Sequence, residues 1–388
     1  MSPPEVPLLG DVTLTGWVVA AAGVAGLVAG SIFSWAELLV LGVAGLAAFA
    51  LSLVAVRIPR GGSYTLTAGP TRTTTGGRLG ARVDVRAGRL PLVSPELRIP
   101  TGPSLYRVRL PLLGAGRGHL ESVEIAAVRR GVHEIGPAKR VTGDPLGICR
   151  TLTRVTGTVE VFVRPLTTPL GSLAPGMVND LEGVPSDQLS VSDLAFHALR
   201  EYVRGDDLRH VHWKSSARAD RLLVRQYQET RRSSAVVLVD TFARSYADEE
   251  DLELAVSAAA SVLVRALQDD FDVAFGWDDQ GVASDASHPD PLLDATCRVE
   301  VQPLDNLKAA VARTATNVPG ASLVVLVSGG KRRLGDLTLA ISAFPPDALR
   351  IVIRADHAGR TAMSEHLGQR VITVSRLTHL GPLLAEGR

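Results

Sequence analysis

Two long uncharged apolar stretches open the chain. Between Asp11 and Glu37 lie 25 residues without a charge, and a second uncharged run extends from there to Val56. Each is as long as the roughly 20 apolar residues that a helix needs to cross a bilayer. A secretory signal peptide is a poorer interpretation, because the first ten residues hold no Lys or Arg and a second apolar run follows at once. The predicted boundaries are residues 1–12 for an N-terminal tail, 13–57 for a transmembrane hairpin, and about 14–34 and 38–56 for its two helices.

The flanking charges predict the orientation of this hairpin. Arg57 and Arg60 follow the second apolar run, whereas the turn between the runs contains Glu37 and no positive charge. Positive residues stay preferentially on the cytoplasmic side. We therefore expect a protein with two spans whose soluble domains face the cytoplasm. Trp17 and Trp35 lie near the ends of the first run, where aromatic residues anchor a helix at the membrane surface.

The soluble part begins with short alternating segments. Residues 62–166 contain several runs with apolar and polar positions in alternation, separated by Gly and Pro, and no helical pattern interrupts them. This pattern is typical of an antiparallel sandwich or barrel, and we expect a β-sandwich-like domain. Residues 167–199 follow, and their Pro- and Gly-containing first half predicts a linker.

Strands and helices alternate in residues 231–388. The apolar run that ends at Asp240 has the composition of a buried parallel strand, and residues 248–268 carry a helical apolar stripe. Further strand patterns follow, one of which ends near Ser328. We therefore predict a doubly wound α/β domain, in which ligands bind at the carboxyl ends of the strands, near Asp240 and Ser328.

Composition excludes some classes of partner. The formal net charge is +1 and charged residues make up 21% of the chain, so no overall field favours nucleic acid. The two cysteines, Cys149 and Cys297, are far apart and lack the spacing of a metal site, which is typical of a reducing compartment.

The densest polar chemistry lies in residues 200–230. Arg200 to Arg225 contains seven Lys or Arg residues, four acidic residues, two histidines and Trp213. Gly205 indicates a turn, and the aspartates that follow it suit a helix N-cap or a ligand set. The acidic residues largely cancel the basic ones, so we predict no nucleic-acid binding here.

Two segments together resemble one bacterial protein family. Arg129–Arg150 is similar to its segment R-G-x-x-x-x-G-P followed by D-P-x-G, and Arg200–Tyr227 is similar to its motif R-x-Y-x-x-G-D-x-x-R-x-I-H-W-x-x-S-A-R. The family is called domain of unknown function 58. The positions that match the second motif are Arg200, Tyr202, Gly205, Asp206, Arg209, His212, Trp213, Ala217 and Arg218.

The resemblance implies a membrane hairpin, a β domain and a C-terminal domain like von Willebrand factor A. It also implies a bacterial cell membrane as location, and as partners a MoxR-type AAA+ ATPase and other membrane proteins. No catalytic activity is established for the family. The resemblance therefore implies an adaptor or scaffold in protein assembly or cell-envelope maturation, without a cofactor.

The metal site that the resemblance implies is degraded in this chain. A von Willebrand A domain holds Mg²⁺ with D-x-S-x-S after its first strand, but Phe242 and Arg244 replace the two serines after Asp240. The later Thr-Asp-Gly position reads Ser328-Gly329-Gly330 and lacks the carboxylate. We therefore predict that no metal binds, and that Asp240 pairs with Arg244 or caps the following turn.

Enzymatic alternatives rest on the charged segment. Asp206, His210 and His212 suit a zinc site and would make the protein a metal-dependent hydrolase. His212 beside Ser215 and Ser216 invites a nucleophile–base interpretation, but no G-x-S-x-G turn surrounds them.

The interpretation that we prefer is structural and interactional. Arg204, Asp206, Arg209, His212 and Arg218 are expected to form a charge-assisted hydrogen-bond network that joins the linker to the α/β domain. Trp213 is expected to anchor this network by burial. A partner then binds the exposed part of the segment, and the protein itself is not an enzyme.

Overall fold

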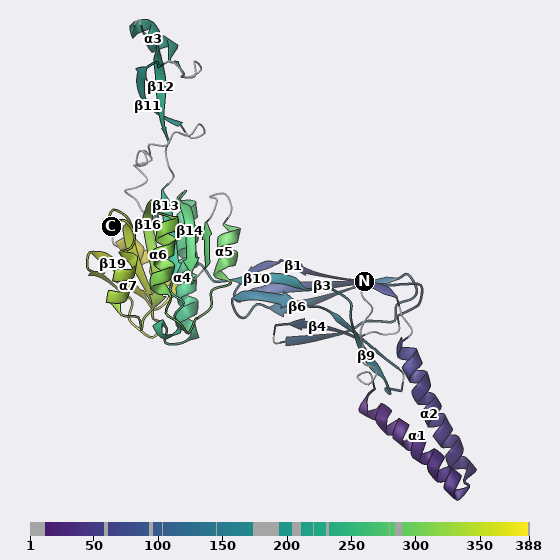
Figure 1. The fold of residues 1–388 in the computed structure, drawn as a ribbon. Helices are drawn as coiled ribbons and strands as arrows, with labels where there is room; N and C mark the ends of the chain where they lie inside the picture. Colours follow the sequence, from purple (N-terminus) through teal and green to yellow (C-terminus); the bar gives the residue numbers. More distant parts are fainter. Residues whose placement is uncertain are drawn as a thin grey trace. The chain divides into compact units, whose positions relative to one another are not determined.

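The fold consists of two compact units, Met1–Val163 and Arg164–Arg388 (Figure 1). A computed structural model describes residues 12–57, 61–92, 96–102, 104–144, 146–173, 194–203, 211–219, 221–229, 233–278, 280–283 and 289–386.

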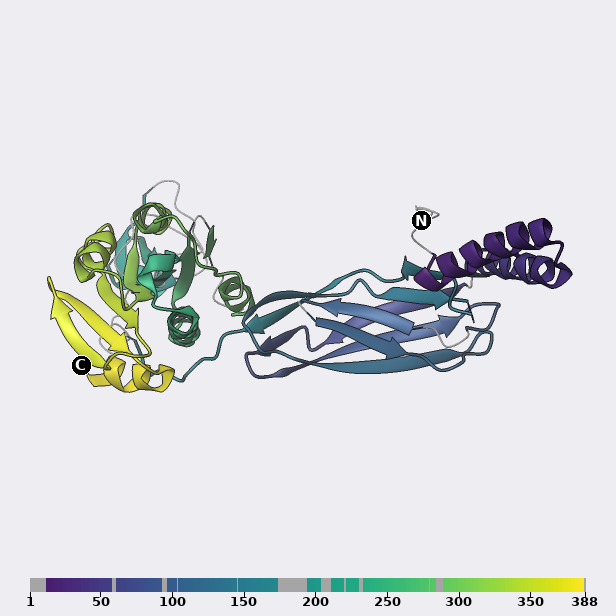
Figure 2. The same ribbon diagram turned by 90° about the horizontal axis from the view of Figure 1, so that it is seen from below.

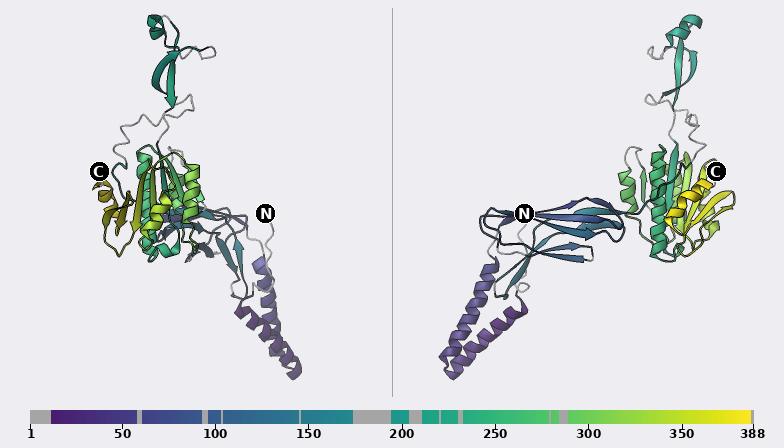
Figure 3. Two further views of the ribbon diagram at one scale, coloured as in Figure 1. Left: turned by 60° about the vertical axis from the view of Figure 1, so that its left-hand side comes forward. Right: turned by 180° about the vertical axis from the view of Figure 1, so that it is seen from behind.

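Two apolar helices form an antiparallel pair at the start of the first unit, α1 (Leu14–Phe33) and α2 (Ala36–Arg57) (Figure 3). The Thr13 hydroxyl caps α1 by accepting a hydrogen bond from the Gly16 N–H, and Ser34 ends it in a left-handed conformation. Both helices are long and apolar enough to cross a membrane, as predicted. Only 17% and 11% of their most apolar windows are buried, whereas a core helix of a soluble protein is mostly buried.

Glycines allow α1 and α2 to approach closely. Gly16, Gly23 and Gly30 recur every seven residues and are the buried residues of α1. A Cβ atom on Gly30 would lie 2.8 Å from the backbone nitrogen of Leu39, and one on Gly42 would lie 2.8 Å from the backbone nitrogen of Leu27. Larger side chains at these positions would therefore push the helices apart.

Two antiparallel sheets make up the β domain of the first unit (Figure 2). One sheet has the order β1-β3-β6, with β1 (Gly62–Gly69), β3 (Arg78–Ala87) and β6 (Gly118–Ala126). The other has the order β2-β10-β7-β4-β8-β9, with β5 also paired to β4. Its strands are β2 (Arg72–Thr74), β4 (Glu96–Thr101), β5 (Ser104–Arg109), β7 (Gly131–Ile135), β8 (Lys139–Gly143), β9 (Arg150–Arg154) and β10 (Val159–Arg164).

One hydrophobic core joins the two sheets of the β domain. Val83 and Val85 of β3 are fully buried in the same cluster as Leu97 and Ile99 of β4. The residues that alternate with Val83 and Val85 along β3 are partly buried or exposed, because neighbouring side chains of a strand point to opposite faces of the sheet. The arrangement is that of a β-sandwich.

A seven-stranded, mainly parallel sheet forms the centre of the second unit, in the order β15-β14-β13-β16-β17-β19-β18. Only the edge strands β15 and β18 pair antiparallel. The strands are β13 (Ser234–Val239), β14 (Asp272–Trp277), β15 (Gln280–Ala283), β16 (Ala321–Gly329), β17 (Leu349–Ala355), β18 (Ala362–His366) and β19 (Gln369–Val374). The helices are α4 (Glu249–Gln268), α5 (Asp290–Thr296), α6 (Leu307–Asn317), α7 (Leu334–Ile341) and α8 (Leu380–Glu386).

Helices cover both faces of this sheet. Val237 and its neighbours on one face of β13 pack in the core that includes α4, whereas Val236 and Leu238 pack in the core that includes α6 and α7. Because both faces of β13 are covered, its apolar residues do not alternate with polar ones. The second unit is an α/β domain with parallel central strands.

A separate two-stranded sheet pairs β11 (Leu194–Glu201) with β12 (Leu223–Glu229), and the short helix α3 (Trp213–Ala219) lies between them in the chain. These elements contain the described part of the charged segment.

Both ends of the predicted linker are part of the fold. Leu170 and Leu173 are buried in the core that includes α4, and the Leu173 N–H donates to Asp269 at 3.0 Å. Residues 194–199 belong to β11. The two buried leucines explain why residues 167–173 pack against the α/β domain and do not form a free linker, because they give this segment enough apolar surface to bind. Residues 174–193 lie outside the described part of the chain.

Candidate functional site at the carboxyl end of the central sheet

Asp240 follows β13 directly and is almost completely buried. One carboxylate oxygen accepts a hydrogen bond from the Phe242 N–H at 3.1 Å, which closes the turn after the strand. The other accepts hydrogen bonds from the hydroxyls of Ser245 at 2.6 Å and Ser328 at 2.7 Å. The prediction that Asp240 caps the following turn is confirmed, and Ser328 lies beside it because β13 and β16 are neighbouring parallel strands.

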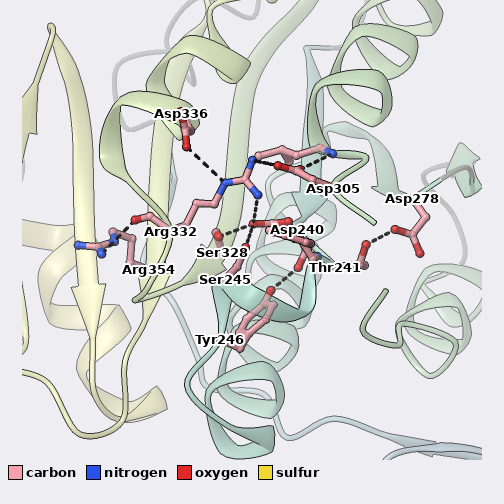
Figure 4. A network of polar contacts seen from close by, with 12 residues as sticks. Asp240, Thr241, Ser245, Tyr246, Asp278, Asp305, Ser328, Arg332, Asp336 and Arg354 are labelled. Carbon is pink, nitrogen blue, oxygen red and sulfur yellow. Dashed lines mark hydrogen bonds and ion pairs between the residues drawn. The ribbon is translucent and has the colours of Figure 1, made fainter. Parts of the chain in front are cut away.

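The cation beside Asp240 is Arg332 (Figure 4). Its guanidinium lies 3.9 Å from Asp240, 2.8 Å from Asp305 and 4.0 Å from Asp336, and its side chain is only 7% exposed. It also lies over the Phe242 ring, 5.4 Å from the ring centroid. A charged group this deeply buried needs opposite charges close by, and these three carboxylates supply them.

Of the two roles predicted for Asp240, capping the turn and pairing with Arg244, the pair with Arg244 does not form. Residues 243–245 form a short 3-10 helix that leaves Arg244 exposed and turns Ser245 inward. Arg332 reaches Asp240 instead, from the loop after β16. The sequence held one signal for this loop, the run Gly329-Gly330-Lys331-Arg332 directly after a buried apolar strand.

Close backbone contacts fix the same loops. The Tyr246 hydroxyl donates to the backbone oxygen of Asp240, and the Lys331 N–H donates to the backbone oxygen of Ser245 at 3.1 Å. A Cβ atom on Gly329 would lie 2.1 Å from that Ser245 oxygen, so only glycine fits there. At the next strand, the Thr241 hydroxyl donates to the Asp278 carboxylate.

This donor set does not fit a divalent metal. Magnesium requires several free oxygen ligands in octahedral geometry. Both oxygens of Asp240 already accept hydrogen bonds, and the Arg332 guanidinium supplies a positive charge at the same carboxylate. The network therefore holds two loops together and offers no place for metal-assisted chemistry.

The charged segment is described only in part. Gly205, Asp206 and Arg209 fall within residues 204–210, which lie outside the described residues, as does His210. The predicted network and the zinc alternative both depend on them and stay predictions. Among the remaining motif residues, Arg200 belongs to β11 and the Tyr202 N–H donates to the Leu222 oxygen at 2.9 Å. His212 precedes α3, and Trp213, Ala217 and Arg218 lie on it.

Trp213 is not buried, so its predicted role as a buried anchor is wrong. Its side chain is 62% exposed at the first position of α3. The buried residue of this helix is Ser216, whose hydroxyl accepts from the Leu223 N–H at 2.8 Å and donates to the His212 oxygen at 3.1 Å. A helix of two turns buries only one side, and here a small hydroxyl side chain occupies that side.

Ser216 also does not suit the nucleophile–base interpretation. Its oxygen is held by two backbone groups, and His212 Nδ1 accepts a hydrogen bond from the Ser215 N–H at 3.2 Å. The serines and the histidine therefore stabilise the junction of α3 with β12.

Asp248, Asp251 and His357 form a second cluster, at the start of α4. Their ligand atoms lie within 4.8 Å of one another. Asp251 is 1% exposed and accepts from the Ala247 N–H at 3.0 Å and from the His357 backbone N–H at 2.8 Å. Its oxygens are therefore occupied, and Asp248 caps the helix through the Asp251 N–H at 3.1 Å.

The Asp251–His357 contact shifts both pKa values. The hydrogen bond from His357 Nδ1 to Asp251, 3.0 Å long, raises the pKa of His357 although burial opposes this, and the nearby acids add to the effect. Burial alone would raise the pKa of Asp251, but the donors from His357 and Ala247 hold it below its usual value. The cluster therefore links the cap of α4 to His357.

Solved structures align with only part of the chain. The CARDB domain of a Pyrococcus furiosus protein is 14% identical, and the alignment covers 27% of this chain and 93% of that domain with a TM-score of 0.22. The sporulation control protein Spo0M of Bacillus subtilis is 10% identical, with 32% and 55% covered and a TM-score of 0.18. Likenesses at this level carry no argument about fold or function.

No curated protein matches the chain. Residues 198–280 match the model of a family described as "Protein of unknown function DUF58". The matched region contains the charged segment, β13 and the Asp240 turn. This match supports assigning residues 198–280 to the DUF58 family.

Proposed function

We propose that the protein is a membrane-anchored adaptor or scaffold without catalysis of its own. It is proposed to work with a MoxR-type AAA+ ATPase at a bacterial cell membrane, in the assembly or maturation of other proteins. The observation that carries this proposal is the carboxyl edge of the central sheet, where an enzyme of this fold class would bind its ligand. Arg332 neutralises the buried Asp240 there, and both oxygens of that carboxylate are occupied.

The C-terminal unit is proposed to be a von Willebrand A-like domain whose metal has been replaced by an arginine. A parallel sheet with helices on both faces, and an aspartate directly after β13, support this interpretation. Without a metal, such a domain binds partners through its surface.

The apolar hairpin is proposed to be the anchor. Val24 and Val43 are more than half exposed near the middle of α1 and α2, and the hydrocarbon core of a bilayer offers such surfaces a favourable environment. Arg57 at the end of α2 supports a cytoplasmic position for the soluble domains.

The docking element is proposed to be the sheet β11–β12 with α3. An exposed tryptophan is unusual for a surface that only meets water, and tryptophan is enriched among the residues that carry binding energy at protein interfaces. Trp213 shares the short helix α3 with the exposed Lys214 and Arg218, so this helix presents both an apolar anchor and charges.

Crosslinking in native membranes followed by purification tests the proposal. Wild type is compared with Trp213→Ala and with Leu339→Ala, a matched control because Leu339 is 61% exposed on α7. We expect an AAA+ ATPase to be recovered with wild type and with the Leu339→Ala control. With Trp213→Ala we expect the ATPase to be lost while the protein stays folded. Equal recovery from all three variants would remove Trp213 from the docking surface. Absence of an AAA+ ATPase from every sample would refute the adaptor role.

A further inference from the structure

One loop of the β domain holds the start of α1. The loop joins β8 to β9, and its Ile148 oxygen accepts a hydrogen bond from the Thr13 N–H at 3.0 Å. The Thr13 hydroxyl donates to the Gly147 oxygen at 2.6 Å. The contact is tight, because a Cβ atom on Gly16 would lie 2.4 Å from the Ile148 oxygen. The first turn of the helix is therefore part of the β domain's surface.

The same loop also holds α2. Asp144 accepts hydrogen bonds from the N–H groups of Leu146 at 2.8 Å and Cys149 at 2.5 Å, which close the loop on itself. Its carboxylate also lies close to the hydroxyl of Ser52, a buried residue near the end of α2. Burial alone would raise the pKa of Asp144, but these donors hold it below its usual value, so the carboxylate stays charged at neutral pH. The β domain thus binds both helices at one end of the hairpin.

These contacts determine how far the loop lies from the bilayer. Thr13 directly precedes the apolar span of α1, and Ser52 lies five residues before Arg57, the end of α2. At 1.5 Å per residue, Ser52 is about 8 Å along the helix from Arg57, within the last two turns of α2. A loop that contacts both residues must therefore lie at the level where the span leaves the hydrocarbon.

The exposed residues of the loop suit that level. Leu146 is 64% exposed and faces no core, and Arg150 is exposed at the start of β9. Trp17, in the first turn of α1, is 48% exposed, as expected of an aromatic residue at a membrane surface. An apolar side chain at the surface gains from leaving water, and a neighbouring arginine gains from anionic headgroups.

We infer that the β domain contacts the bilayer directly through residues 146–150, with Leu146 inserted among the lipids and Arg150 at the headgroups. This inference rests on the proposed membrane anchoring of the hairpin. The occupant is lipid and not a second protein, because the hydrogen bonds of Thr13 place the loop beside the membrane end of α1. The β domain is then seated on the membrane surface at a fixed height.

Spin labels on the full-length protein in vesicles of phosphatidylcholine and phosphatidylglycerol test this contact. Single cysteines replace Leu146, Leu105 and Val24, and collisions with oxygen are compared with collisions with a water-soluble nickel complex. Leu105 is a matched control, because it is 49% exposed and lies away from the loop between β8 and β9. It pairs with Pro100 near one end of β4, whereas β8 pairs with β4 from Glu96, at the other end. The native cysteines are buried, and wild type treated with the same reagent gives the background.

We expect the ratio of oxygen to nickel collisions to be several-fold higher at Leu146→Cys than at Leu105→Cys, and highest at Val24→Cys. Equal ratios at Leu146→Cys and Leu105→Cys, with Val24→Cys in lipid, would overturn the loop contact and leave the anchor intact. A water-exposed label at Val24→Cys would overturn the anchor itself, and the loop contact with it.

Discussion

Replacing Arg332 by methionine isolates the positive charge beside the buried Asp240. Methionine keeps an apolar stem against the Phe242 ring and removes the guanidinium. Asp240 would then be a carboxylate with 1% exposure of its side chain, held only by two hydroxyl donors at one oxygen and one backbone N–H at the other.

The expected cost follows from the distance and the burial. At 3.9 Å and an effective dielectric constant of about 20, two unit charges attract by about 4 kcal/mol. Removing one partner of a buried pair costs about 3–5 kcal/mol in proteins. Asp240 keeps three hydrogen bonds, so we expect the lower end, a loss of about 3 kcal/mol in the free energy of unfolding of the α/β domain. The exposed Arg244, replaced by methionine, should cost less than about 0.5 kcal/mol.

Urea unfolding followed by tryptophan fluorescence measures this loss. Trp277 is 5% exposed and stacks on Phe275, with 5.0 Å between ring centroids, whereas Trp17, Trp35 and Trp213 are about half exposed or more. The change in tryptophan fluorescence on unfolding therefore comes mainly from Trp277 and reports the unfolding of the α/β domain. In an Asp240→Asn background, Arg332→Met should cost about 1 kcal/mol or less, because no buried charge loses its partner. Equal costs for Arg332→Met and Arg244→Met would refute the reasoning that Arg332 compensates Asp240.

Three further predictions address the helix cap, the hairpin and the absence of a metal. His357 has a raised pKa, so its stabilising contribution is complete below about 6.5 and is lost as pH rises through the raised value. Asp251 has a lowered pKa, so its contribution is present above about 3.8 and is lost as pH falls. The urea midpoint of unfolding should therefore be highest between pH 3.8 and pH 6.5. The variant His357→Gln should lose less of this midpoint than wild type when the pH rises above that range. An unchanged dependence of the midpoint on pH in this variant would contradict the role of His357 in the cap. Gly42→Ala should destabilise the hairpin by about 1–3 kcal/mol in SDS titrations. Gly45→Ala is the control, because the nearest atom to its new Cβ would lie 3.6 Å away, and it should not destabilise the hairpin. Equal destabilisation by the two substitutions would refute the close packing of α1 and α2. Elemental analysis of the purified full-length protein should find less than stoichiometric zinc and magnesium, and one tightly held zinc per chain would support the hydrolase alternative.

The sequence was sufficient for the two apolar helices and for the buried parallel strands. Long uncharged runs predict the two apolar helices, and unbroken apolar runs such as the one before Asp240 predict buried parallel strands, because burial alone selects these patterns. The structure confirms both. Capping by Asp240 was also predictable, since an aspartate after a strand readily accepts a hydrogen bond from the turn that follows.

Contacts between loops were not predictable. The sequence suggested Arg244 as a partner for Asp240. A 3-10 turn directs Arg244 outward, and Arg332 from the loop after β16 lies beside Asp240 instead. The exposure of Trp213 has a similar origin, because a seven-residue helix buries one side and the phase of that side is set by Ser216. Periodicity over so few residues does not reveal the phase.

The seven-residue spacing of glycines in α1 restricts how the hairpin can change its length. A single inserted residue between Gly23 and Gly30 would rotate Gly30 by about 100° around the helix axis. Gly30 would then face away from Leu39, and a larger side chain would meet α2 in its place. Changes in the length of this hairpin are therefore expected at the turn near Ser34, or in steps of whole heptads, and not within the helix.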